Sequence, residues 1–409
     1  MASRGREHAA DAGGREAVER PRRRRRPSRK AQLARDRAIQ TLTLCVLSAA
    51  LAGAVTWRWA QRAPGPARLV APADAVHADP RATPPESYAW TAQPAPQFPI
   101  PPYARFLKEA TVVLDPGHVG QRDRPGYKRG PTGLREAAAN LSVTLFLREF
   151  LEAAGARVIL TREQDESLDL DDDDDLRDRA EIANRANADL LLSIHHNAAE
   201  SSANFTTLFY HGDAGENPAS ADAARWLLGG LNDALRLETH IGCAIQSDYS
   251  LFGSGLAVLR QARVPAVLSE ASFHTNRDEE ERLRDPVYNR REAYGLFLGV
   301  ARWAQAGLPR VRVVQPSNGL PRAGQPLVLK LEDGLSHRGG MGDKLLKSRT
   351  PSLRVEWNGS PVAYRVNWGT REVTLTPTAE MLRGAAELRV DFANAFGQHV
   401  LRPVIDLRP

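Results

Sequence analysis

The sequence predicts an α/β domain with a mostly parallel sheet flanked by helices, an N-terminal transmembrane helix before it and a C-terminal immunoglobulin-like β-sandwich after it. Three observations support this fold class. Strand and helix patterns alternate between residues 110 and 306, an uncharged run of 19 residues lies near the N-terminus, and short alternating apolar runs follow residue 310. At 409 residues, the chain also exceeds the roughly 250 to 300 residues that one hydrophobic core supports.

The N-terminal segment, residues 1–38, is a basic tail. Residues 1–37 hold 13 Lys or Arg and 5 Asp or Glu, a net charge of +8, whereas the whole chain carries +6. The sequence pI of about 9.5 therefore reflects this tail and not a basic folded surface. We expect no nucleic-acid partner.

A single transmembrane helix is expected over residues 39–58. The run 39–57 has no charged residue, and at about 1.5 Å per residue it spans a hydrocarbon layer of about 30 Å. Basic residues before it, including the run Arg22 to Arg26, place the N-terminus inside, so the following domains would lie outside the cytoplasmic membrane, in the periplasm or cell wall. Cleavage as a signal peptide near Ala50 is the alternative, but such peptides have shorter apolar runs of about 7 to 15 residues.

Residues 59–102 form a proline-rich linker. The stretch 63–102 holds 11 prolines in 40 positions, a composition typical of extended polyproline II spacers. The two cysteines, Cys45 and Cys243, predict no disulfide and exclude a zinc site made of four thiolates. Any metal must therefore be bound by His and carboxylate side chains.

Residues 103–309 carry the α/β pattern. Strand and helix alternate through this segment, which indicates a sheet covered on both faces. We expect strands at 111–115, 156–160, 189–195, 205–210 and 265–270, and helices from about 134 up to Gly155 and over about 176–188, 219–235 and 287–306.

Four polar residues are expected at one edge of this sheet. His118 follows the first strand, and His195 and Glu270 end later strands, where ligand sites of parallel sheets lie. Glu136 opens the helix after the His118 loop and could fold back beside it. Two imidazoles and a carboxylate are the donor set of a catalytic zinc with one open position. Each residue alone is more often structural, since a first-turn Glu simply answers the helix dipole.

The acidic run Asp171 to Asp175 raises the possibility of a calcium site. Its carboxylates are consecutive, without the alternating spacing and the glycine of a calcium-binding loop. We interpret it as a solvated loop that caps the helix beginning near Leu176.

Several ordered motifs of residues 110–306 resemble those of the zinc-dependent N-acetylmuramoyl-L-alanine amidases of the amidase 3 family. They are VVLDPGHVG (112–120), GLREAAANL (133–141), LTR (160–162), AEIANRANADLLLSIHHNA (180–198) and VLRQARVPAVLSEASFHTN (258–276). The resemblance implies that His118, Glu136 and His195 bind one Zn²⁺ and that Glu270 is the catalytic carboxylate, acting as general base and acid on a zinc-bound water.

The resemblance also implies the substrate, which is the peptidoglycan amide between N-acetylmuramic acid and the L-alanine of the stem peptide. The chain would then be a peptidoglycan hydrolase. Four residues depart from the family pattern: Val119, His196, Ser272 and His274. Because successive strand side chains alternate in direction, only one of His195 and His196 can join the site easily. We choose His195, which leaves His196 as a neighbour of the ligands or a substrate-facing residue.

Two other functions remain open at this stage. One is a membrane-anchored peptidoglycan-binding scaffold without turnover, although such a protein has no physical need for all four polar residues. The other is a zinc peptidase that acts on the stem peptide with the same metal chemistry.

Residues 310–409 predict the β-sandwich accessory domain. The spacing of short alternating runs is typical of such a fold, and a Gly- and Lys-rich segment, 335–349, is expected to be a loop. No catalytic set occurs in it, so a role in glycan binding is a hypothesis only. The expected strands are 326–331, 353–357, 362–368, 372–377, 387–392 and 400–407.

Overall fold

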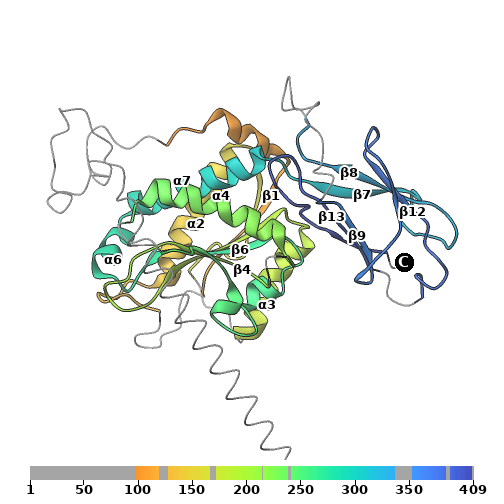
Figure 1. Ribbon diagram of the computed structural model, residues 1–409. Coiled ribbons are helices and arrows are strands. Elements are labelled where there is room, and N and C mark those ends of the chain that lie inside the picture. Colours follow the sequence, from red (N-terminus) through yellow and green to blue (C-terminus); the bar gives the residue numbers. More distant parts are fainter. Residues whose placement is uncertain are drawn as a thin grey trace, which may run out of the picture. The chain divides into compact units, whose positions relative to one another are not determined.

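A computed structural model of the protein describes residues 98–118, 128–165, 172–213, 215–237, 241–336, 352–383 and 387–407 (Figure 1). The predicted basic tail, the transmembrane helix, nearly all of the proline-rich linker and most of the loop 335–349 lie outside these residues. Within the described part of the chain, no helix is both long and apolar enough to cross a membrane.

A six-stranded sheet forms the centre of the α/β domain, in the order β2-β1-β3-β6-β4-β5. All five strands that the sequence predicts for this domain are present, and a short edge strand, β5, was not predicted. Their bounds are β1 Thr111–Pro116, β2 Arg157–Leu160, β3 Leu190–Asn197, β4 Thr207–Tyr210, β5 Ile245–Ser247 and β6 Ala266–Phe273.

The sheet is mixed: four of its five strand pairs are parallel, in agreement with the predicted mostly parallel sheet, and one pair is antiparallel. Strands β2, β1, β3 and β6 are parallel, but β4 pairs antiparallel with β6, and β5 runs parallel to β4. Only residues 198–206 connect β3 to β4, and none of them is helical. A parallel crossover needs about a dozen residues or more, so this short connection reverses the chain direction.

Helices cover both faces of the sheet, as the alternating pattern predicts. The four predicted helices occur as α2, α3, α4 and α7, and the shorter helical segments were not predicted. The bounds are η2 Pro102–Glu109, α2 Glu136–Ala153, α3 Asp172–Arg185, α4 Pro218–Leu235, η3 Asp248–Ser250, α5 Ala257–Arg260, α6 Arg277–Leu283 and α7 Pro286–Gln305.

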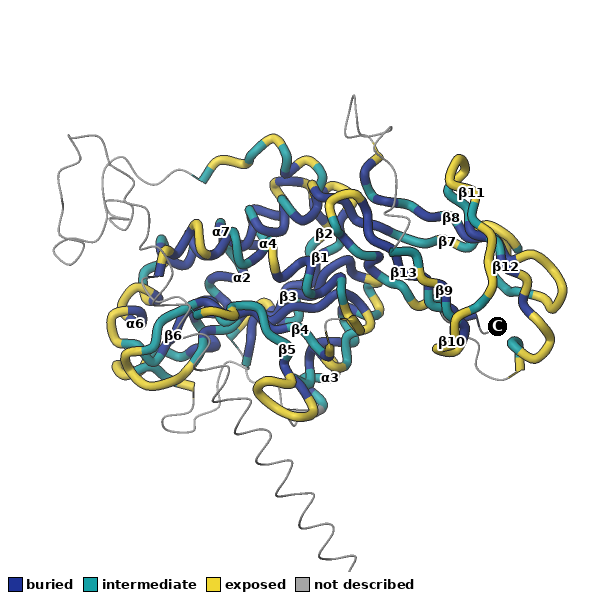
Figure 2. Tube along the Cα trace, in the orientation of Figure 1, coloured by how far each residue is buried: buried dark blue, intermediate teal, exposed yellow. Residues whose placement is uncertain are grey.

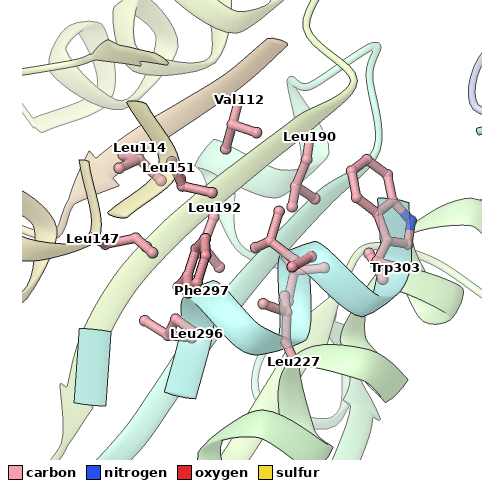
Figure 3. Close-up of a cluster of buried hydrophobic side chains, with 14 of the residues drawn as sticks. Val112, Leu114, Leu147, Leu151, Leu190, Leu192, Leu227, Leu296, Phe297 and Trp303 are labelled. Carbon is pink, nitrogen blue, oxygen red and sulfur yellow. The ribbon is translucent and has the colours of Figure 1, made fainter. Parts of the chain in front are cut away.

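Alternation along the strands divides the hydrophobic core between the two faces. On β1, Val112 and Leu114 pack in one buried cluster with residues of α2, α4 and α7, whereas Val113 packs in a second cluster with residues of α3 and α5. Figure 3 shows part of the first cluster around Leu192 and Phe297. Most of the tube along β1, β3 and β6 is buried in Figure 2, as expected for strands covered on both faces.

Two four-stranded antiparallel sheets follow α7, in the orders β10-β9-β13-β14 and β11-β12-β8-β7. They share one cluster of buried apolar residues that includes Leu329 and Trp357. Strand β7 was not predicted, and the immunoglobulin-like sandwich stays a prediction. The bounds are β7 Arg310–Gln315, β8 Leu327–Glu332, β9 Arg354–Trp357, β10 Ser360–Pro361, β11 Arg365–Asn367, β12 Glu372–Leu375, β13 Glu387–Asp391 and β14 Val404–Asp406.

Candidate metal centre

The loop after β1 presents His118 in an uncommon backbone conformation. Its φ of 61° lies in the left-handed region, which costs energy for a residue other than glycine and needs support from its surroundings. Gly117, just before it, lies against the ring of His195, and a Cβ at this position would overlap that ring. The pair Gly117-His118 therefore allows two imidazoles to approach each other closely.

Two buried arginines provide this support. Arg162 donates to the carbonyl oxygens of Pro116 (3.0 Å) and Gly117 (3.1 Å), and Arg179 donates to those of Pro116 (3.0 Å) and His118 (3.1 Å). The guanidinium groups of Arg162, two residues after β2, and Arg179, in α3, thus hold three consecutive carbonyl groups. Such buried, charge-assisted hydrogen bonds are among the stronger ones in proteins.

Asp115, in β1, neutralises part of this buried positive charge. Its carboxylate accepts from Arg179 Nη1 at 2.8 Å, from Ser193 Oγ at 2.7 Å and from Thr161 Oγ1 at 2.6 Å. Burial alone would raise the pKa of Asp115, but the Arg179 charge and the two hydroxyl hydrogen bonds outweigh it, so the pKa is lowered. The ionised Asp115 carboxylate therefore fixes the position of Arg179, which in turn holds the loop carbonyls.

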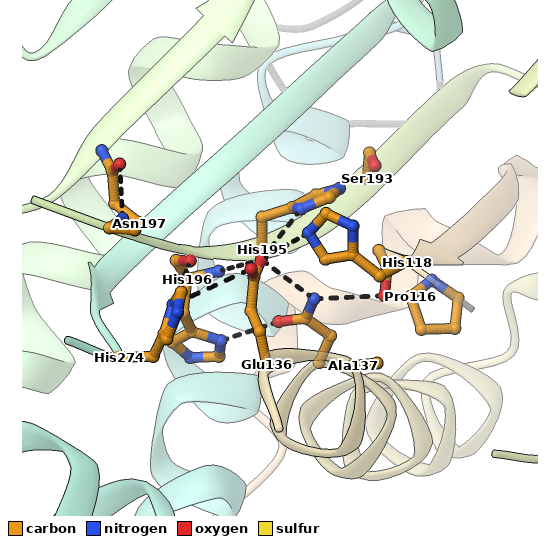
Figure 4. Close-up of polar contacts among 12 residues, drawn as sticks. Pro116, His118, Glu136, Ala137, Ser193, His195, His196, Asn197 and His274 are labelled. Atoms are coloured by element: carbon orange, nitrogen blue, oxygen red, sulfur yellow. Dashed lines mark hydrogen bonds and ion pairs between the residues drawn. The ribbon is translucent and has the colours of Figure 1, made fainter. Parts of the chain in front are cut away.

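The structure brings His118, Glu136 and His195 together (Figure 4). Glu136 Oε1 lies 3.0 Å from His118 Nε2 and 3.1 Å from His195 Nδ1. The two imidazole rings are 4.7 Å apart at their centroids and nearly perpendicular. One potential ligand atom from each of the three residues lies within 4.8 Å of the others. Residues separated by up to 77 positions in the sequence therefore form one compact donor set.

The charges of this cluster act on one another. Burial would raise the pKa of Glu136, but the charges of and hydrogen bonds with His118 and His195 lower it well below its usual range. Burial, with the His118 charge, lowers the pKa of His195 despite the opposing effect of Glu136. Glu136 is therefore ionised and His195 favours the neutral form, and these are the protonation states in which carboxylate and imidazole bind metals.

Glu270 lies beside this cluster on β6, where it pairs in register with His195 on β3. Its Oε2 is buried and accepts no hydrogen bond from the described residues. Burial, followed by the negative charge of Glu136, raises the pKa of Glu270 well above its usual range. These two carboxylates lie 134 positions apart in the sequence, yet the fold brings them close and shifts their pKa values in opposite directions, so one favours the ionised form and the other the protonated form.

His196 and His274, two of the departures from the family pattern, are not on the ligand side of the cluster. The His196 ring is completely buried and faces α2 and α7, which rules out a substrate-facing role. His274 is 1% exposed, its Nδ1 donates to the His196 carbonyl at 2.9 Å, and this nitrogen is 3.8 Å from Glu136 Oε2. Both histidines therefore pack behind Glu136.

The donor set fits a divalent transition metal. Two imidazole nitrogens and a carboxylate are the three protein ligands of many catalytic zinc sites. Glu136 Oε2 is buried and accepts no hydrogen bond from the described residues, so this carboxylate retains free acceptor capacity. The side chains of His118 and His195 are 19% and 14% exposed, which leaves the imidazoles accessible from one side.

Sequence reasoning assigned no role to the buried polar residues that support the candidate ligands through hydrogen bonds: Asp115, Asn140, Arg162, Arg179 and Glu292. One signal was present for Asn140, which lies four residues after Glu136 and so shares its helix face. For Glu292, the sequence showed only a charged residue within a helix that is largely apolar on its buried side. Arg162 ends the motif LTR (160–162), although no role was assigned to it, and Arg179 gave no such signal.

Comparisons with known proteins find amidases that are similar to this chain. Residues 112–302 match the family described as N-acetylmuramoyl-L-alanine amidase. The chain is 29% identical over 213 residues to the germination-specific N-acetylmuramoyl-L-alanine amidase of Bacillus subtilis, with 49% of this chain and 83% of that protein covered. It is 30% identical over 183 residues to the probable cell wall amidase LytH of Staphylococcus epidermidis, and it spans about half (54%) of that relative, over 44% of this chain.

Solved amidase structures also align with this chain. The CwlD amidase from Clostridioides difficile, solved in complex with the GerS lipoprotein, aligns with a TM-score of 0.41 and 29% identity, covering 47% of this chain and 98% of that one. The amidase Ami1 from Mycobacterium smegmatis aligns with a TM-score of 0.42 and 23% identity, covering 48% and 98%.

Proposed function

We propose that this chain, whose residues 112–302 form a domain of the N-acetylmuramoyl-L-alanine amidase family, hydrolyses peptidoglycan at the amide between N-acetylmuramic acid and the L-alanine of the stem peptide. The observation that carries the proposal is the convergence of His118 and His195 on one oxygen of Glu136, with Glu270 on the adjacent strand. We assign one Zn²⁺ to this site, with His118, Glu136 and His195 as its ligands.

An amide resists hydrolysis because its carbonyl is a weak electrophile and its nitrogen is a poor leaving group. Bound Zn²⁺ supplies a Lewis acid that polarises the carbonyl and makes water acidic enough to attack at neutral pH. The protein must supply the remaining proton transfers and the positioning of the reacting groups.

Glu270 is suited to both proton transfers. Its carboxylate takes a proton from the attacking water while the water oxygen forms a bond to the carbonyl carbon. The raised pKa of Glu270 lets the carboxyl keep this proton until it passes to the amide nitrogen, whose bond to carbon then breaks. The products are the free muramic acid carboxylate and a stem peptide with a free L-alanine amino group.

Two experiments on the purified full-length chain test this function. Peptidoglycan digested by the zinc-loaded protein should release stem peptides that begin with a free L-alanine amine, as identified by mass spectrometry. Removal of the metal with a chelator should abolish the release, and added Zn²⁺ should restore it. Fragments cut within the stem peptide would instead indicate a zinc peptidase, and binding without any product would indicate a scaffold.

We also propose that residues 39–58 tether the enzyme to the cytoplasmic membrane with its catalytic domain outside. The uncharged run and the basic residues before it support this arrangement. After expression in a bacterium, the full chain should remain in membranes washed with alkaline carbonate, and protease added from outside should degrade the catalytic domain. Release of the intact domain from the cells would instead support cleavage near Ala50.

The domain boundaries 103–309 and 310–409 and a glycan-binding role of the second domain are further parts of this proposal. The two antiparallel sheets that follow α7 share one apolar cluster, which supports a boundary near residue 310. If residues 310–409 bind glycan, their removal should weaken sedimentation of the chain with purified cell wall. Unchanged sedimentation would remove this role.

A further inference from the structure

Three buried polar side chains, those of Glu292, His196 and Asn140, connect α7 to Glu136 by hydrogen bonds. None of the three has a role in the proposed reaction. Glu292, on α7, lies 3.0 Å through Oε2 from Nε2 of His196, and both side chains are completely buried. The other ring nitrogen of His196, Nδ1, lies 2.8 Å from Oδ1 of Asn140 on α2. Asn140 is also fully buried. A carboxylate enclosed in this way needs a specific partner, and His196 supplies it.

The hydrogen-bond partners determine the orientation of the Asn140 amide and the protonated nitrogen of His196. The side-chain NH₂ of Asn140 lies 3.2 Å from the carbonyl oxygen of Gly117 and 3.4 Å from Glu136 Oε1, and both of these oxygens can only accept. Its oxygen must therefore face His196, whose Nδ1 must carry a proton. If the amide turned over, its oxygen would face two acceptors at once.

The backbone of His196 contributes a second contact to the same atom. The His196 amide nitrogen donates to Glu136 Oε1 at 3.3 Å, while the neighbouring residue, His195, places Nδ1 3.1 Å from this oxygen. Glu136 Oε1 thus lies between two groups of residues. The His196 backbone amide and the Asn140 side chain are on one side, and the candidate ligands His118 and His195 are on the other. Such donors around a ligand carboxylate fix its orientation and commonly change metal affinity by about 10- to 100-fold.

We propose that His196 and Glu292 are positioning residues for the ligand Glu136, acting through the side-chain amide of Asn140. Glu292 holds the His196 ring, His196 fixes the orientation of the amide, and the amide fixes both Glu136 and the Gly117 carbonyl. This inference rests on the proposed metal site and extends it to α7, which carries none of the proposed ligands. His196 is thus one of the residues that set the affinity of the metal, from the side opposite the substrate.

The test is a double variant that removes the whole polar pair, His196→Leu with Glu292→Met. A single substitution at either position would also leave the buried Glu292 carboxylate or the His196 ring without its partner, whereas in the double variant only Asn140 Oδ1 loses a donor. In the full-length chain, we expect the Zn²⁺ dissociation constant, measured by chelator competition, to rise about 10- to 100-fold. The visible absorption spectrum of the Co²⁺-substituted protein should also change, because the orientation of Glu136 changes.

Two matched variants separate positioning from packing. Tyr288→Phe removes another buried polar contact of α7, the 2.7 Å hydrogen bond from the Tyr288 hydroxyl to Glu279 Oε1, and leaves in place the hydrogen bonds that join Glu292, His196 and Asn140. It should lower the melting temperature and leave the Zn²⁺ dissociation constant unchanged. Glu292→Gln can still hold the His196 ring through its amide, so it should keep the metal affinity within about threefold of wild type.

The outcomes are distinguishable. If the wild type binds Zn²⁺ and the folded double variant binds it equally well, this inference is overturned and the proposed function stands. If the wild type binds no Zn²⁺, both are overturned. If the double variant does not fold, Asn140→Ala replaces it, because the smaller side chain removes the amide without a clash. Wild-type Zn²⁺ affinity in that variant would overturn the inference, and a loss of 10-fold or more would support it.

Discussion

Glu270 and His195 are register partners on the neighbouring parallel strands β6 and β3, so their side chains leave the same face of the sheet next to each other. This relationship brings the proposed general base beside a proposed metal ligand. It also brings Glu270 near Glu136, whose negative charge contributes to the raised pKa of Glu270. The surroundings thus give the two carboxylates different properties. Two histidines lower the pKa of Glu136, the proposed ligand, whereas burial raises the pKa of Glu270, the proposed base.

Replacing the proposed base should stop turnover without removing the metal. In Glu270→Gln, we expect kcat to fall about 10²- to 10⁴-fold, because the proton transfers lose their carboxylate. The zinc content, measured on the same preparation by atomic emission, should equal that of the wild type. The exposed carboxylate Glu200 supplies the control, and Glu200→Gln should retain wild-type kcat. Full activity in Glu270→Gln would contradict the assigned role.

The pKa of Glu270 should depend on the charge of Glu136. In the metal-free protein, a carbon-detected NMR titration should show the Glu270 carboxyl with a pKa above its ordinary value of 4.5. Substitution of Glu136 by Gln removes the nearby charge but not the burial, so the Glu270 pKa should fall while remaining above 4.5. Glu280 is buried, but hydrogen bonds lower its pKa, and this carboxylate should titrate unchanged in the variant. A Glu270 pKa at or below 4.5 in the wild type would be inconsistent with this electrostatic picture.

The close approach of Gly117 to His195 predicts a strict requirement for glycine. An alanine Cβ at position 117 would overlap the His195 ring, so Gly117→Ala should displace the ring and weaken Zn²⁺ binding by at least about tenfold. Gly229, in the middle of α4, has open space around its Cβ position, and Gly229→Ala should raise stability slightly, by up to about 1 kcal/mol. Chelator competition and thermal unfolding of both variants measure the two effects. Equal Zn²⁺ affinity in Gly117→Ala and wild type would argue against the placement of His195.

The buried pair of Asp115 and Arg179 should make stability depend on pH at the acid end. Because the pKa of Asp115 in the folded protein lies below its ordinary value of 3.8, the pair stabilises the fold above that pH. This contribution disappears as the pH falls through the lowered pKa. At pH 7, Asp115→Asn should reduce the free energy of unfolding by about 3 to 5 kcal/mol, since a buried guanidinium loses a charge partner.

Urea denaturation at a series of pH values tests this dependence. The difference in unfolding free energy between wild type and Asp115→Asn should be greatest at neutral pH and should shrink below about pH 4, where the wild-type carboxyl gains its proton. Asp233, an exposed carboxylate with a surface ion pair to Arg302, provides the comparison, and Asp233→Asn should change stability by less than about 1 kcal/mol at any pH. A constant difference for Asp115→Asn across the pH range would refute the assignment of the charge.

Particular residues show how far the sequence predicts the site. His118, His195 and Glu270 could be assigned to one edge because each follows or ends an apolar run, and the ends of parallel strands meet at the same edge of a sheet. Glu136 was linked to them only by its position at the start of a helix after the His118 loop. The sequence did not predict that β4 runs antiparallel to β6, because periodicity identifies a strand but carries no information on its neighbour.

The sequence by itself determined the order of the main strands and helices of the α/β domain and the residue types of the candidate metal site, since these depend on local periodicity and short motifs. Only the tertiary structure decided which buried residues support the candidate ligands through hydrogen bonds. Arg179 reaches the His118 loop from 61 positions away, and Glu292 reaches His196 from 96 positions away. Such pairs depend on how α3 and α7 pack on the sheet. A buried charge is stabilised by whichever partner that packing brings to it, and local sequence does not specify that partner.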